Sequence, residues 1–107
     1  MFTLTYTVKF HASHFLPDYE GKCARLHGHN WIAEIECRAE TLNEQGMVAD
    51  FDTLKAAVPD HRHLNDWMEA PPTTENVAAE IYRRLKDQGV PVVAVTVNLP
   101  LERLLQI

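Results

Sequence analysis

Two long stretches of alternating apolar and polar residues constrain the fold of this chain more than any other feature. Apolar side chains occupy the even positions of residues 2–14, and the odd positions of residues 27–40 become apolar after two histidines. A period of two is typical of a strand with one buried face. The pattern therefore predicts two long strands, and antiparallel pairing would bring the end of the first beside the start of the second.

The same alternation sorts the histidines. His14 falls on the apolar face of the first stretch, whereas His11 falls on its polar face. His27 and His29 share one face of the second stretch, because residues two apart in a strand point the same way. Antiparallel pairing then gathers three imidazoles and leaves one tetrahedral position open, as in catalytic zinc sites. We therefore expect His14, His27 and His29 to bind Zn²⁺ and His11 to be a surface residue.

Cys23 and the pair Asp60 and His61 are the other candidates for chemistry. Cys23 lies in a loop, four residues before His27. A nearby cation favours the thiolate, which is a base and a nucleophile; Cys23 could instead be the fourth ligand of a structural zinc, and the residues alone leave both possibilities open. In the irregular polar segment 60–65, Asp60 could orient the imidazole of His61 for proton transfer. Cys37 falls mid-strand on the apolar face and is assigned to the core.

Capping residues predict two helices in the second half of the chain. Asp50 can cap a short helix that ends at Pro59. Thr73 or Thr74 can cap a longer helix that stops at Gly89, with a buried stripe at Val77, Ile81 and Leu85 and an ion pair between Glu80 and Arg84. The exposed N–H groups at the start of this second helix could also bind a polar ligand.

Two further strands complete the expected fold. Residues 90–97 are rich in β-branched side chains on both faces, which predicts a well-covered strand, and residues 101–107 predict a short last strand. This order predicts a single domain over residues 1–107. Its fold class is α+β, with a four-stranded antiparallel sheet and two helices on the apolar face.

Composition narrows the classes of function. The 107 residues carry a net charge of −5 and no basic run, which argues against a nucleic-acid surface that follows phosphates. No apolar run is long enough to span a bilayer. Two cysteines are too few for a disulfide framework, so we expect free thiols and a reducing, cytoplasmic location.

Five segments together give the sequence a family resemblance. They are FHASH at 10–14, CARLHGH at 23–29, GMVADF at 46–51, DHRHLN at 60–65 and PTTEN at 72–76. At these residues the chain resembles the 6-pyruvoyltetrahydropterin synthase / 6-carboxytetrahydropterin synthase family. The resemblance implies the tunnelling fold (T-fold), in which such units form barrels, typically in homohexamers with active sites between subunits.

The resemblance also implies an activity and roles for residues. It implies a zinc-dependent lyase of the 6-carboxy-5,6,7,8-tetrahydropterin synthase type, acting on 7,8-dihydroneopterin triphosphate in queuosine and deazapurine biosynthesis. His14, His27 and His29 match the zinc ligands, Cys23 the general base, Asp60 and His61 the proton relay, and Thr73, Thr74 and Glu75 the pterin-pocket segment.

One position departs from the family pattern. The family follows its third strand with a glutamate that anchors the pterin ring, and here the matching place holds Asn98 or Leu99. Glu102 or Glu75 could serve instead. Three alternatives therefore stay open beside the leading hypothesis: 6-pyruvoyltetrahydropterin formation, a pterin- or zinc-binding paralogue with altered or lost catalysis, and a structural zinc site completed by Cys23.

Overall fold

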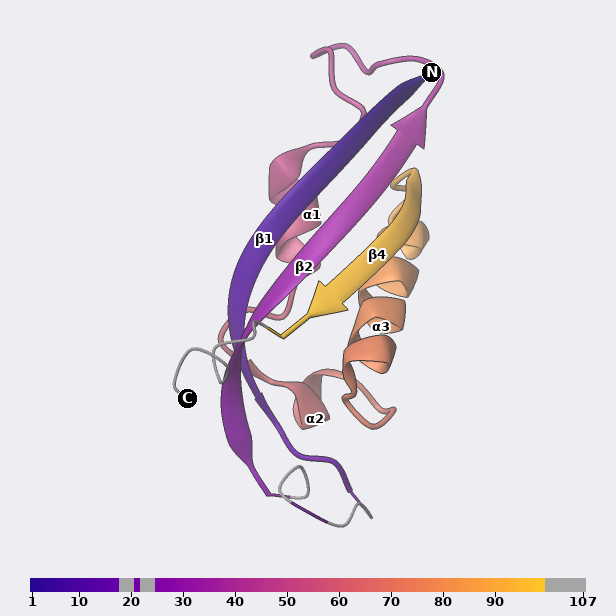
Figure 1. Cartoon of the computed structure of the whole chain (residues 1–107). Coiled ribbons are helices and arrows are strands. Elements are labelled where there is room, and N and C mark those ends of the chain that lie inside the picture. The colour runs from indigo at the N-terminus through magenta and orange to yellow at the C-terminus, as the bar shows by residue number, and fades with distance from the viewer. Residues whose placement is uncertain (18–20, 22–24, 100–107) are drawn as a thin grey trace.

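Two long strands form the frame of the molecule (Figure 1). The computed structural model describes residues 1–17, 21 and 25–99. β1 (Phe2–His14) pairs antiparallel with β2 (His27–Ala39) along its whole length. His14 lies opposite His27, and Ala12 lies opposite His29. The predicted pairing of the two alternating stretches is confirmed, and with it the meeting of the end of the first strand with the start of the second.

The apolar faces of β1 and β2 form the core together with the helices. Fully buried residues from β1 and β2 include Phe10, Trp31, Ala33, Ile35 and Cys37. Figure 1 shows α1 (Phe51–Ala56) and α3 (Thr74–Asp87) on one side of the sheet. The buried stripe predicted for the second helix is present in α3, where Val77, Ile81 and Leu85 are fully buried. The assignment of Cys37 to the core is therefore confirmed.

The helix termini follow the predicted capping chemistry. The carboxylate of Asp50 accepts a hydrogen bond of 2.8 Å from the N–H of Asp52 at the start of α1. The hydroxyl of Thr73, rather than that of Thr74, caps α3. Beyond the end of α3, Gly89 takes a φ of +80°, which a residue without a side chain adopts most easily.

The segment 60–65 is not irregular, and here the prediction was wrong. It forms the two-residue strand β3 (Arg62–His63) and then the one-turn helix α2 (Leu64–Trp67). β3 runs parallel to β1, so the sheet has the order β3-β1-β2-β4 and is mixed, not antiparallel. The α+β class is as expected, but β3 is a strand that was not predicted, and three helices are present among the described residues instead of two.

The last strand of the sheet is less covered than predicted. β4 (Val92–Asn98) begins two residues later than expected and pairs antiparallel with β2 at the edge of the sheet. Val92 is fully buried, but Val93 keeps 43% of its surface exposed. Val95 and Val97 are partly buried against the core, so the prediction of a well-covered strand was wrong mainly at Val93 and Ala94, which are exposed. The strand predicted at 101–107 lies outside the described residues.

The helices of the described part of the chain are short. None of them has the length and apolar character that crossing a membrane requires.

Candidate metal centre and acid–base pair

Three imidazoles meet where β1 ends and β2 begins. The ring centroids of His14 and His27 are 4.5 Å apart, those of His27 and His29 4.5 Å, and those of His14 and His29 5.4 Å. One nitrogen from each ring lies within 4.8 Å of the others. The convergence predicted from strand parity is therefore present. The rings stand at steep angles of 59° to 85° to one another, so they are not a stack of parallel planes.

Backbone carbonyls fix the orientation of two of these rings. His14 Nδ1 donates a hydrogen bond of 2.8 Å to the carbonyl of Pro72, and His27 Nδ1 donates one of 2.6 Å to the carbonyl of Arg25. A carbonyl oxygen only accepts, so each Nδ1 carries a proton, and in a neutral imidazole the lone pair is then on Nε2. Metal-bound histidines are commonly oriented in this way by a hydrogen bond at the other ring nitrogen.

His14 supplies the strongest sign that the cluster suits a metal ion. Its side chain is 5% exposed, and its Nε2 has no hydrogen-bond partner within the described part of the chain. A buried polar atom without a partner is costly, because it has lost its water. A cation between the three rings would satisfy this nitrogen. The residues present thus fit a divalent metal of the kind that imidazole binds, zinc among them.

The protonation of His14 also suits metal binding. Burial is the largest influence and lowers the pKa of His14 below its usual value of 6.5, and the nearby His27 and His63 lower it further. The hydrogen bond to Pro72 acts in the opposite direction and raises the pKa. The net effect keeps His14 neutral near pH 7, which is the form that coordinates a metal.

Trp31 forms the apolar wall next to the cluster. Trp31 is fully buried, and its ring stands nearly perpendicular to those of His14 and His29, at 4.9 Å and 6.1 Å between centroids. Its indole nitrogen donates to the carbonyl of Ala12 at 3.2 Å, which fixes the ring in place. This wall limits how far the imidazoles can turn away from one another.

Asp60 and His61 form an oriented pair, as their adjacency in the sequence allowed. Asp60 Oδ2 lies 3.2 Å from His61 Nδ1, and its Oδ1 accepts a hydrogen bond of 2.9 Å from the N–H of His11. That backbone hydrogen bond is the largest cause that lowers the pKa of the Asp60 carboxyl, and the proximity of His61 lowers it further. A carboxylate that holds one imidazole nitrogen leaves the other nitrogen able to exchange a proton.

The pair and the histidine cluster lie on opposite faces of β1. The ring of His61 lies beside that of His11, with 5.7 Å between centroids, and His11 is exposed on the polar face. His14 differs from His11 in strand parity and is buried on the apolar face. The structure therefore assembles each group separately and does not bring the pair to the cluster of the same chain.

The remaining predicted residues lie beside the histidine cluster, at the end of β4 or outside the described residues. Thr73 accepts a hydrogen bond of 3.1 Å from Asn76, and the Thr74 hydroxyl donates to the carboxylate of Glu75. This segment directly follows Pro72, whose carbonyl holds His14, so it borders the metal cluster. Cys23 and Glu102 lie outside the described residues. Asn98 lies opposite Ile32 on the edge strand, and Leu99 packs against the core.

Two contributors to the metal cluster were missed by the sequence reasoning. The carbonyl of Pro72 is a backbone atom, and no residue type marks it in advance. Asn65 makes two hydrogen bonds to the backbone of Phe15, next to His14, across fifty positions of sequence. Its amide in a polar segment after His61 was the one available signal, and it did not identify the partner.

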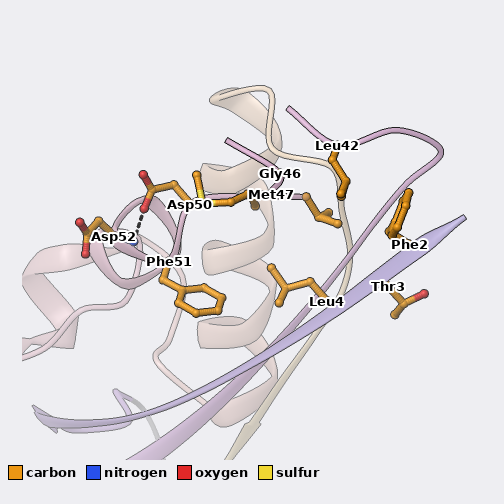
Figure 2. A pocket seen from close by; sticks show the side chains of 11 residues that line it. Phe2, Thr3, Leu4, Leu42, Gly46, Met47, Asp50, Phe51 and Asp52 are labelled. Carbon is orange, nitrogen blue, oxygen red and sulfur yellow. Dashed lines mark hydrogen bonds between the residues drawn. The ribbon is translucent and has the colours of Figure 1, made fainter. Parts of the chain in front are cut away.

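A groove of about 570 Å³ lies at the other end of β1, near the N-terminus (Figure 2). Phe2 and Leu4 of β1 line it together with Phe51 of α1, and the lining is mostly apolar. Its carboxylates are Asp50 and Asp52, and Asp50 is engaged in capping α1. The groove brings no imidazole or thiol together, so we place the candidate site at the histidines.

Comparisons with known proteins identify the family of the chain. A family model described as 6-pyruvoyl tetrahydropterin synthase matches residues 3–100. A Synechocystis protein named 6-carboxy-5,6,7,8-tetrahydropterin synthase is 42% identical over 94 residues, covering 77% of this chain and 73% of that protein. A protein of Archaeoglobus fulgidus with the same name, marked putative, is 37% identical over 90 residues, covering 78% of this chain and 76% of the relative.

A comparison with solved structures leads to the same family. The structure of Caenorhabditis elegans 6-pyruvoyl tetrahydropterin synthase superposes with a TM-score of 0.65 at 25% identity, covering 92% of this chain and 95% of that one. Sequence and fold therefore agree, and the chain belongs to the 6-pyruvoyl tetrahydropterin synthase family.

Proposed function

We propose that this protein is a zinc-dependent lyase of the 6-carboxy-5,6,7,8-tetrahydropterin synthase type. Its substrate would be 7,8-dihydroneopterin triphosphate, on the path to queuosine and other deazapurines. The observation behind the proposal is the cluster of His14, His27 and His29, in which the buried Nε2 of His14 has no partner within the described residues. The names of the Synechocystis and Archaeoglobus relatives support the choice of reaction.

The residues of the chain would divide the work as follows. His14, His27 and His29 would hold Zn²⁺, which supplies a Lewis acid for the oxygens of the substrate side chain. Cys23 would act as the general base, as the family resemblance implies. Asp60 holds His61 through Nδ1, so the other nitrogen of His61 would move a proton to or from the substrate. Thr73, Thr74, Glu75 and Glu102 are the proposed contacts of the pterin.

The opposite placement of pair and cluster supports a homo-oligomer with sites between subunits. A reaction that uses both groups needs His61 of one copy beside the histidine cluster of another. The uncovered edge strand β4 fits this arrangement, because an exposed strand edge pairs readily with another chain. We propose a hexamer in which Asp60 and His61 act on the metal site of a neighbour.

A product assay with matched variants tests the activity. The zinc-loaded protein is incubated with 7,8-dihydroneopterin triphosphate and with sepiapterin, and the products are identified by mass. We expect a 6-carboxytetrahydropterin product; a 6-pyruvoyl product would favour the sister activity instead. His27→Ala should lose both zinc and turnover, whereas His11→Ala, an exposed histidine on the other face, should keep zinc. Bound zinc without any product would contradict the lyase and favour a binding protein.

Cys23→Ala separates a base from a ligand. If Cys23 is the base, the variant keeps zinc and loses turnover. If the variant loses zinc instead, Cys23 is the fourth ligand and the site is structural.

A mixing experiment tests the arrangement between subunits. His27→Ala and His61→Ala should each be inactive alone. After dissociation and reassembly together, some sites would combine an intact cluster with an intact pair, and activity should return. Lack of any recovery in confirmed mixed oligomers would show that both groups act within one chain.

A further inference from the structure

The segment 60–65 is bonded to β1 at successive points along its length. Near its start, the carboxylate of Asp60 and the N–H of His61 bind the backbone of His11. Arg62 and His63 then pair with Ala12 and Ser13 as β3. Each step along the segment therefore corresponds to a step along β1 toward His14. The segment turns into α2 at Leu64, which ends this backbone pairing.

Asn65 continues the contact after the strand pairing has ended. Its Oδ1 accepts a hydrogen bond of 3.0 Å from the N–H of Phe15, and its Nδ2 donates one of 3.0 Å to the carbonyl of Phe15. Both bonds are partly buried. A carboxamide that binds both backbone groups of one residue acts like one more strand residue. Asn65 thus fixes the backbone of the residue that directly follows His14.

The position of this contact matters because β1 stops at His14. On one side the last paired residue of β1 is His14 itself, opposite His27, and on the other side it is Ser13, opposite His63. The two bonds from Asn65 are the next ones along the chain. Without them, the backbone would be held on only one side of His14, and the strand end could fray.

His14 also needs an accurate backbone position for its ring to point into the cluster. Its Nδ1 is held by Pro72 at 2.8 Å, which leaves Nε2, buried and without a partner within the described residues, as the nitrogen available to the cluster. A shift of the backbone would break the hydrogen bond to Pro72 or turn Nε2 away. Metal sites lose affinity when the groups that orient their ligands are removed.

We propose that Asn65 is a positioning residue of the metal site, whose carboxamide holds the end of β1 so that His14 Nε2 stays aimed at the metal position. The inference rests on the metal site of the proposed function and deepens it. Asn65 does not touch the metal position itself; it acts through the backbone of Phe15. A purely structural role would lower stability and leave the affinity for zinc unchanged.

The test compares Asn65→Leu with Ser13→Ala. Asn65→Leu keeps a side chain of similar size and removes both bonds to Phe15. Ser13→Ala removes a neighbouring bond between β1 and the same segment, the 3.0 Å contact of the Ser13 hydroxyl with His63 Nδ1. Ser13 points to the face opposite His14, so its loss weakens the attachment of the segment without changing the aim of the ring.

Two quantities are measured on each purified protein. Zinc affinity is obtained by competition with a chelator, without substrate, and the free energy of unfolding of the metal-free protein is obtained with urea. We expect Asn65→Leu to weaken zinc binding by about tenfold or more, and Ser13→Ala to leave it close to wild type, even where both lower stability. The absorption spectrum of bound Co²⁺ should change in Asn65→Leu and not in Ser13→Ala.

Asn65→Asp gives a second and milder variant if Asn65→Leu does not fold. It keeps the acceptor for the N–H of Phe15 and loses the donor to its carbonyl, so we expect an intermediate zinc affinity. If a folded variant without the Asn65–Phe15 hydrogen bonds bound zinc as tightly as wild type, the positioning role of Asn65 would be overturned, and the proposed function would be unaffected. Failure of the wild-type protein to bind zinc would overturn the proposed function. Zinc binding without product would leave the positioning role standing.

Discussion

Replacing His14 with phenylalanine would separate what this ring does for folding from what it does for metal binding. The ring is 5% exposed and lies against Trp31, so a phenyl ring of similar shape fits the same space. The change removes the buried Nε2 that has no partner within the described residues, and it also removes the Nδ1 hydrogen bond to Pro72. Removing the unpaired Nε2 should stabilise the folded protein, whereas removing the bond to Pro72 should destabilise it.

The two effects on the free energy of unfolding are of similar size. Relief of an unsatisfied buried nitrogen is worth about 1–3 kcal/mol, and loss of the bond to Pro72, with its carbonyl left unpaired, costs about the same. We therefore expect the metal-free His14→Phe protein to unfold within about 1 kcal/mol of wild type. Zinc at about a hundred times its Kd should stabilise the wild type by about 2.7 kcal/mol and the variant hardly at all.

The variant should also lose part of the pH dependence of folding. Because burial lowers the pKa of His14, the unfolded chain binds this proton more readily than the folded chain does. The contribution of His14 to stability is therefore fully present above the unfolded value of 6.5 and is lost as the pH falls through the lower folded value. The phenylalanine variant has no such group, so its stability should fall less in this range.

Urea unfolding with a chelator and with zinc, above and below pH 6.5, measures all three effects. Ile81→Val in α3 is a suitable control, because it perturbs the core without touching the cluster. A loss of more than about 3 kcal/mol in the metal-free variant would refute the cancellation of the two terms. Undiminished stabilisation by zinc would refute the role of His14 as a ligand.

Three further predictions follow from contacts near the candidate site. Thr73→Ala removes the cap of α3 and should lower the free energy of unfolding by about 1 kcal/mol; an unchanged urea midpoint would show that water replaces the cap. Arg84→Met removes the hydrogen bond to the carbonyl of Trp67 and the guanidinium that lies 4.2 Å from the centroid of the Trp67 ring. It should lower the melting temperature more than Arg38→Met, a control at an exposed arginine, and equal effects would contradict the prediction. Asp60→Asn should lower the free energy of unfolding near neutral pH and match wild type in acid. The lowered pKa of Asp60 stabilises the fold above pH 3.8, and this stabilisation is lost as the pH falls through the pKa of the folded state. A stability difference that stays constant across an acid titration would contradict this prediction.

The two long strands could be predicted because each of their residues reports its own environment. Alternation over thirteen residues assigns every side chain to a face, and one assumption about pairing then places His14 beside His27 and His29. The same parity separated His11 from the cluster. The helix caps at Asp50 and Thr73 are local signals as well, since the side chain and its partner lie within three residues.

The segment 60–65 could not be predicted in the same way, because its structure depends on a distant partner. β3 has two residues, too few for a period to appear, and it is stabilised by β1 about fifty positions away. The exposure of β4 was missed for a related reason. Its β-branched residues indicate a strand but do not say whether a second layer covers it.

The backbone of His61 supports the proposal that the acid–base pair acts outside its own chain. His61 has a φ of +56°, a left-handed conformation that costs a residue with a side chain about 1–2 kcal/mol. Its pair with Asp60 returns little of this, because the two side chains are 77% and 40% exposed and such surface pairs contribute about 0–1 kcal/mol.

Within the chain this conformation is supported by the hydrogen bond of 2.6 Å from the N–H of His61 to the carbonyl of His11, and the strain that remains suggests a further role for His61. The structure does not bring His61 to the cluster of the same chain. His11, whose ring lies beside that of His61, and His14 are three positions apart on one strand and point to opposite faces of it. The strain at His61 and its place on the polar face are both consistent with the proposed role of His61 at the histidine cluster of a second copy.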